Sequence, residues 1–130
     1  MACFLVPTAE AIVTTIVTKA EESKEKKEPV EKKAEAKISL ATKLHWLNYL
    51  LFGGAILLAF EHLWHGEVVP WFPFLTAASS PEDTATMLHE MSTVGVTMAI
   101  LVTVVWVGIC IAADAIVKRS ADRVAAGGAR

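Results

Sequence analysis

Two apolar runs decide the fold of this chain: LHWLNYLLFGGAILLAFEHLW at residues 44–64 and VGVTMAILVTVVWVGICIAADAIV at residues 94–117. As a helix the first run is about 31 Å long, which matches the hydrocarbon core of a bilayer. The second run is slightly longer. The sequence therefore predicts an all-α membrane protein, a two-transmembrane-helix antiparallel hairpin with a flexible charged N-terminal arm.

Basic residues are distributed asymmetrically around the two runs. Eight of the twelve Lys and Arg residues lie at or before Lys43, and the other four lie at or after Lys118. The segment between the runs carries only acidic charges. Because Lys and Arg stay on the cytoplasmic side of membrane helices, we expect both termini in the cytoplasm and the loop outside. The expected location is the inner membrane of the cell.

The chain divides by composition into four parts. Residues 1–20 form a short amphipathic segment, too short to span a bilayer, for which a helix on the inner leaflet or on a partner is favoured over a strand. Residues 21–38 are a Lys/Glu-rich linker that cannot bury a core. The membrane hairpin covers residues 39–118, with spans at about 44–64 and 94–117 and an outer loop at 65–93, and a short basic cytoplasmic tail covers residues 119–130.

Composition also excludes several classes of function. Hydrophobic residues make up 54% of the chain, which is high for a soluble domain. No basic patch with interleaved aromatic residues is present, which argues against nucleic-acid binding. The two cysteines, Cys3 and Cys110, lack metal-ligand spacing and are expected to be unpaired thiols. No arrangement typical of nucleophilic catalysis or nucleotide binding is present, so we expect no enzyme activity.

Helix boundaries have local signals. Ser39 is an expected N-cap for the first membrane helix, and Gly66 its expected end. Ser80 and Pro81 predict that the second helix begins well outside the membrane. At the inner end of that helix, Asp114 can pair with Lys118.

Helix packing in lipid depends on small and polar residues, because apolar surface gains nothing by leaving lipid. Such residues lie on roughly one face of the first membrane helix, and in the second they recur at intervals of four in two sets. They are Asn48, Ala55, Ala59 and His62 in the first helix, and Gly95, Ala99, Thr103, Gly108 and Ala112 in the second.

A cluster of His and Glu residues at the outer ends of both helices is the candidate site. Imidazole and carboxylate groups suit zinc, iron or copper, and two His from opposite helices could instead hold a b-type haem. An interfacial role without any ligand is the competing interpretation. The candidate ligands are Glu61, His62, His65, His89 and Glu90, with Glu67, Met87 and Met91 nearby.

Three functions fit these features. The favoured one is a non-enzymatic accessory or interaction subunit of a membrane assembly, without a cofactor, which contacts the lipid bilayer and either its own copies or other membrane subunits. The first alternative is a metal- or haem-binding redox or metal-handling subunit that uses the outer cluster. The second is a holin-like pore-forming hairpin.

Overall fold

The computed structural model of the chain describes residues 2–27 and 37–127, and within them it is all-helical. The main helices are α1 (Leu5–Glu25), α2 (Leu40–Trp64), α3 (Pro81–Glu90) and α4 (Val96–Gly127). A 3₁₀ turn, η2 (Thr76–Ser79), precedes α3, and a π-helical turn, η3 (Met91–Gly95), joins α3 to α4. The predicted all-α class is therefore confirmed.

Two helices are long and apolar enough to cross a membrane. One is α2, with 25 residues, and the other is the continuous 47-residue helix Pro81–Gly127 that α3, η3 and α4 form together. These are the two predicted membrane helices.

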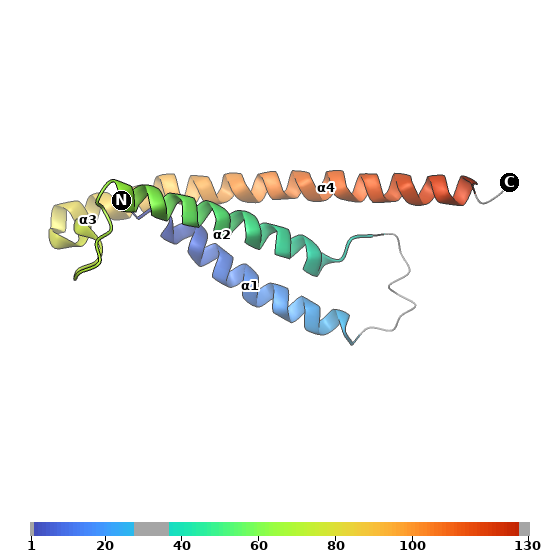
Figure 1. The fold of residues 1–130 in the computed structure, drawn as a ribbon, viewed down its shortest axis with the longest axis horizontal. Helices are drawn as coiled ribbons and strands as arrows, with labels where there is room; N and C mark the ends of the chain where they lie inside the picture. The colour runs from blue at the N-terminus through green and yellow to red at the C-terminus, as the bar shows by residue number, and fades with distance from the viewer. Residues whose placement is uncertain (1, 28–36, 128–130) are drawn as a thin grey trace.

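The helix α4 forms the long axis of the molecule (Figure 1). Both α1 and α2 pack against its N-terminal half, while its C-terminal end projects beyond them. The chain runs in one direction along α1 and α4 and in the opposite direction along α2. As a result Ala2 lies at the loop end of the molecule, far from the C-terminal end of α4.

Residues 1–20, expected as a short amphipathic segment on the inner leaflet or on a partner, form most of α1, which packs within the chain. It lies along α2, where Ala11 is buried against Leu47 and Leu51, with Val102 and Trp106 of α4 packed on this cluster. The helix also extends to Glu25, into the segment expected to be a linker. Half of that segment, residues 28–36, lies outside the described residues.

Capping side chains set the starts of α2 and α3 as the sequence predicts. Ser39 accepts a hydrogen bond from the Thr42 amide, and Ser80 accepts one from the Asp83 amide. The end of α2 differs by two residues, because His65 is the C-cap and Gly66 follows with a φ of +72°. Glycine adopts this left-handed conformation without strain, so the chain can reverse here.

The loop after α2 folds back on itself. The Val69 amide donates to the Phe74 carbonyl over 2.9 Å, and the Thr76 amide donates to the Glu67 carbonyl over 3.0 Å. Its aromatic tip, which contains Trp71 and Phe72, is exposed. The loop is thus ordered by its backbone, and its aromatic side chains are left on the surface.

Gly95, at the end of η3, lies close to Val6 of α1. A Cβ added to Gly95 would lie 2.8 Å from Val6 Cγ2 and 3.2 Å from the Cys3 carbonyl oxygen, so only glycine allows this approach. Ala99, one turn further, is buried. By contrast, a Cβ added to Gly108 would have no neighbour within 4 Å. The small residues that begin at Gly95 therefore pack against α1, whereas Gly108 does not.

Candidate functional site

The outer end of α2 brings together part of the predicted cluster. His62 is buried, and its Nδ1 donates to the Leu58 carbonyl over 2.6 Å. Its two ring nitrogens lie 3.6 Å from a Glu61 oxygen and 3.7 Å from a Glu67 oxygen. The Phe4 ring packs edge-on against the imidazole, with centroids 5.5 Å apart. This contact of His62 with Phe4 joins the start of α1 to the end of α2.

The other predicted ligands are more dispersed. His65 is exposed and lies 3.8 Å from Glu61, while His89 is exposed on α3. Met87 is buried with Ala2 and Ala77 in a separate apolar cluster. Among residues 2–27 and 37–127, no three His, Cys, Asp or Glu side chains are placed to hold a metal ion together. Metal or haem binding by Glu61, His62, His65, His89 and Glu90 stays a prediction.

Polar contacts between the helices are the more distinctive feature of the structure. At the inner end, Lys43 of α2 donates to Asp114 of α4 over 2.6 Å. The Trp106 indole donates to the Lys43 carbonyl over 2.7 Å. The expected partner of Asp114 was Lys118 on its own helix. The pair instead joins two helices, and Lys43 is buried in doing so.

One turn deeper, Asn48 joins α2 to α1. Its side-chain oxygen accepts a hydrogen bond from Thr14, and its amide donates to Thr18 over 3.2 Å. Thr18 and Asn48 are both buried. The two threonines also donate to carbonyls one turn earlier in α1, so all three side chains have partners inside the bundle.

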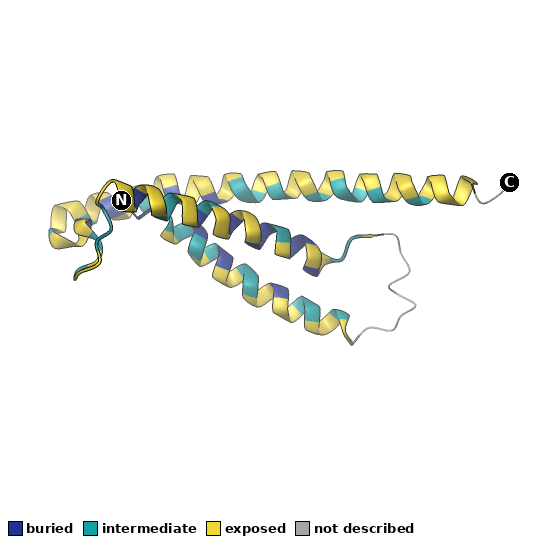
Figure 2. Cartoon of the chain, in the orientation of Figure 1, coloured by how far each residue is buried: buried dark blue, intermediate teal, exposed yellow. Residues whose placement is uncertain are grey.

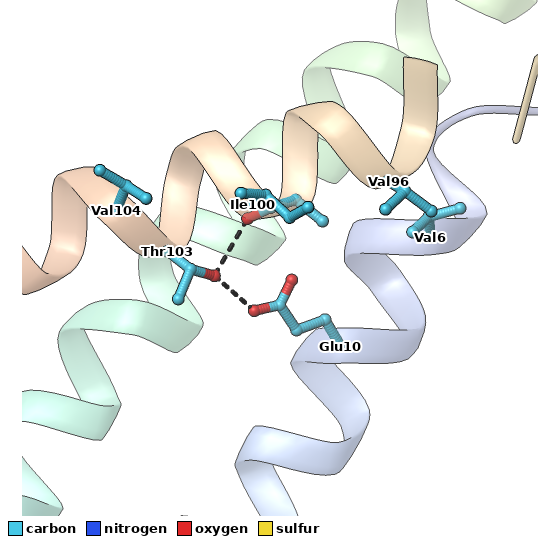
Figure 3. A pocket seen from close by; sticks show the side chains of 7 residues that line it. Val6, Glu10, Val96, Ile100, Thr103 and Val104 are labelled. Atoms are coloured by element: carbon cyan, nitrogen blue, oxygen red, sulfur yellow. Dashed lines mark hydrogen bonds between the residues drawn. The ribbon is translucent and has the colours of Figure 1, made fainter. Parts of the chain in front are cut away.

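The third contact joins α1 to α4. The Thr103 hydroxyl donates to Glu10 Oε1 over 2.7 Å and lies 3.0 Å from the Ala99 carbonyl oxygen (Figure 3). Glu10 and Thr103 line a groove of about 310 Å³ whose other walls are apolar. The carboxylate is thus held at the depth of the apolar run of α4.

A fourth contact lies near the C-terminal end of α1. His45 Nε2 and Glu22 Oε1 are 2.7 Å apart, and this hydrogen bond holds the pKa of Glu22 below its ordinary value. Both side chains are partly exposed. The contact fixes the last turns of α1 beside the first turns of α2.

Sequence reasoning did not identify Glu10 as a functional residue. A signal was present, because Glu10 is the single acidic residue among residues 1–20, in the middle of a β-branched apolar segment. An ionisable group at membrane depth marks a functional position by default. Because this segment is too short to span a bilayer, the sequence alone does not predict that Glu10 lies at membrane depth.

No protein-family model, curated protein or solved structure matches this chain.

Proposed function

We propose that this chain is a small integral membrane protein that acts as a non-enzymatic accessory or interaction subunit of a membrane assembly. Its two long apolar helices support the membrane location. The polar contacts at Glu10, Asn48 and Lys43 support a fixed frame of three helices, since such contacts hold helices together where lipid surrounds them.

The observation that carries this proposal is the outward apolar surface of α4. Only 11% of the most apolar stretch of the continuous helix Pro81–Gly127 is buried within the chain, and Ala99 is the one buried residue of α4 itself. Figure 2 shows exposed positions along almost the whole helix. In a bilayer this surface faces lipid or other membrane helices. The longest helix of this 130-residue chain therefore leaves most of its surface free to contact other membrane subunits.

The proposed orientation follows from the basic residues. Lys43, near the start of α2, lies beside Asp114 in the second half of α4, and Lys19 and Lys24 lie in the second half of α1, toward the same end of the bundle. We place this end in the cytoplasm and the loop end outside. The C-terminus is then cytoplasmic, as expected from the sequence. Ala2 would lie at the outer interface, so that the N-terminal position differs from the sequence-based expectation.

Extraction of the source membranes in a mild detergent tests the accessory role. We expect the chain to remain in the membrane after a carbonate wash and to migrate, once extracted, in a defined complex larger than one chain. Recovery of the monomer alone, at protein concentrations found in the membrane, would contradict the proposal. The composition of the complex decides between self-association and association with other subunits.

A further inference from the structure

We propose that the groove between α1 and α4 is a docking site for a membrane helix of another protein that carries a basic side chain, Lys or Arg, at the depth of Glu10. This inference rests on the proposed accessory function and names the chemistry of its partner. Its basis is the incomplete satisfaction of the Glu10 carboxylate.

Glu10 receives less hydrogen bonding than a carboxylate requires. A hydroxyl has one hydrogen to donate, and the Thr103 hydroxyl is shared between Glu10 Oε1 and the Ala99 carbonyl. Among the described residues, no side chain donates to the second carboxylate oxygen. An ionised carboxylate accepts several hydrogen bonds and is costly to keep in an apolar environment without a partner.

The missing hydrogen-bond donor to Glu10 matters because this carboxylate lies at a depth where the membrane offers no water. Thr103 lies nine residues after Val94 and fourteen before Val117, which is about 14 Å and about 21 Å along a helix. The contact therefore lies well inside the expected hydrocarbon layer. Charged groups at this depth pair with one another or face a polar cavity.

The groove is shaped for an apolar helix surface around this charge. Figure 3 shows the carboxylate extending from α1 toward α4, near Val6 and Thr103. The remaining lining consists of Val96, Ala99, Ile100 and Val104, which cover about 12 Å of α4. Two helical turns of small and β-branched side chains, open on one side, can accept the side chains of a packed helix.

The basic group must come from outside this chain. No Lys or Arg lies between Lys43 and Lys118, and none precedes Lys19 in α1. Lys43 is already paired with Asp114. A second copy packed side by side would bring another Glu10 to this depth and no base, so charge complementarity favours a different protein.

The test uses the purified full chain in phosphatidylcholine vesicles with two membrane-spanning Leu/Ala peptides of about 20 residues. One peptide has Lys at its centre and the other has Leu there, and both carry a dansyl group that accepts energy from the tryptophans of the chain. We expect the Lys peptide to associate about tenfold more tightly. Glu10→Gln should remove this difference, whereas Glu82→Gln, in the exposed first turn of α3, should preserve it.

A charge exchange separates docking from misfolding. The Glu10→Lys variant should prefer a peptide with Glu at its centre over the Lys peptide. Equal association of the Lys and Leu peptides with the wild type, absence of association, or a preference that survives Glu10→Gln would each overturn the proposal. The size of the complex extracted from source membranes tests the accessory function separately. A larger complex that persists with Glu10→Gln would support the accessory function and reject this groove as the docking site.

Discussion

At the scale of single residues, the bundle is held by polar side chains that lipid cannot satisfy. Asn48 is the clearest case, since it both accepts from Thr14 and donates to Thr18 across the α1–α2 contact. Interhelical hydrogen bonds in membranes contribute modestly, about 0.6 kcal/mol on average and up to about 2 kcal/mol. The hydrogen bonds of Asn48 also fix which faces of α1 and α2 meet.

Replacing Asn48 with Leu should therefore loosen α1 from α2. We expect the free energy of unfolding in bicelles to fall by about 1 kcal/mol, because the hydrogen bonds that join α2 to Thr14 and Thr18 of α1 are lost. Tyr49→Leu is the matched control, since the neighbouring Tyr49 is 76% exposed and should change stability by less than about 0.5 kcal/mol. Equal effects of the two substitutions would show that Asn48 does not join the helices.

The Lys43–Asp114 pair should behave as a coupled unit. Lys43→Met leaves the Asp114 carboxylate without its partner, and Asp114→Leu leaves a buried ammonium. Each single change is expected to reduce stability by about 1–3 kcal/mol, and the double variant should lose less than the sum, because no unpaired charge remains. A double-mutant cycle in detergent measures this difference. Additive losses would mean that the pair is not coupled.

The Glu22–His45 contact should make the end of α1 sensitive to acid. Because the hydrogen bond from His45 lowers the pKa of Glu22 in the folded chain, its contribution is complete above the ordinary value of 4.5. The contribution is lost as the pH falls through the lower, folded value. Titration of the Glu22 carboxyl by NMR should give a lower midpoint in the wild type than in His45→Leu. Identical midpoints would mean that the contact is absent in solution.

At the scale of elements, local chemistry predicted the helices, but distant contacts determined their partners. Ser39 and Ser80 cap the helices they were expected to cap, because capping depends on residues three positions away. The pairing of Asp114 with Lys43, and of Thr103 with Glu10, joins residues 71 and 93 positions apart. No periodicity within one helix contains that information, which is why α1 was expected on the membrane surface.

The π-helical turn η3 shows the same limit. Its sequence, MSTVG, carries no recognisable signal for a π-turn. A Cβ added to Gly95, at its end, would meet Val6 of α1 and the carbonyl of Cys3, which lies just before α1. The prediction of the His and Glu cluster has the same limit. His62 and Glu61 are close because they are neighbours in one helix, whereas the position of His89 depends on how α3 packs.

A pair of glycine substitutions tests this close approach. Gly95→Ala should push α1 away and lower stability by about 1–3 kcal/mol, because its Cβ would lie 2.8 Å from Val6 Cγ2. Gly108→Ala should be neutral or stabilising by up to about 1 kcal/mol, because its Cβ meets nothing and alanine favours the helix. Unfolding in detergent measures both. A neutral Gly95→Ala would mean that α1 does not pack on η3.

At the scale of the whole molecule, the position of α1 determines the topology. Phe4 packs on His62 at the outer end of α2, and Glu22 meets His45 at the inner end, so α1 extends along most of α2. If α1 lay on the inner leaflet with both termini in the cytoplasm, the Phe4–His62 and Glu10–Thr103 contacts would both be lost. The arrangement of three helices therefore requires the N-terminal end of α1 on the side of the loop.

Accessibility in intact cells decides between these topologies. We expect an epitope tag placed before residue 1 and a cysteine introduced at Ser79 to be reached by impermeant reagents, in a variant with Cys3 and Cys110 replaced by Ser. In the proposed orientation, a cysteine introduced at Ala126 should react only after permeabilisation, because the basic C-terminal end would lie in the cytoplasm. The decisive result is the tag. If it is protected together with Ala126, α1 cannot lie along α2 as described, and the groove that contains Glu10 would not form. If the tag is exposed together with Ser79, then α1 crosses the membrane beside α2 and α4. The Glu10 carboxylate then lies inside the bilayer, where it needs a basic partner.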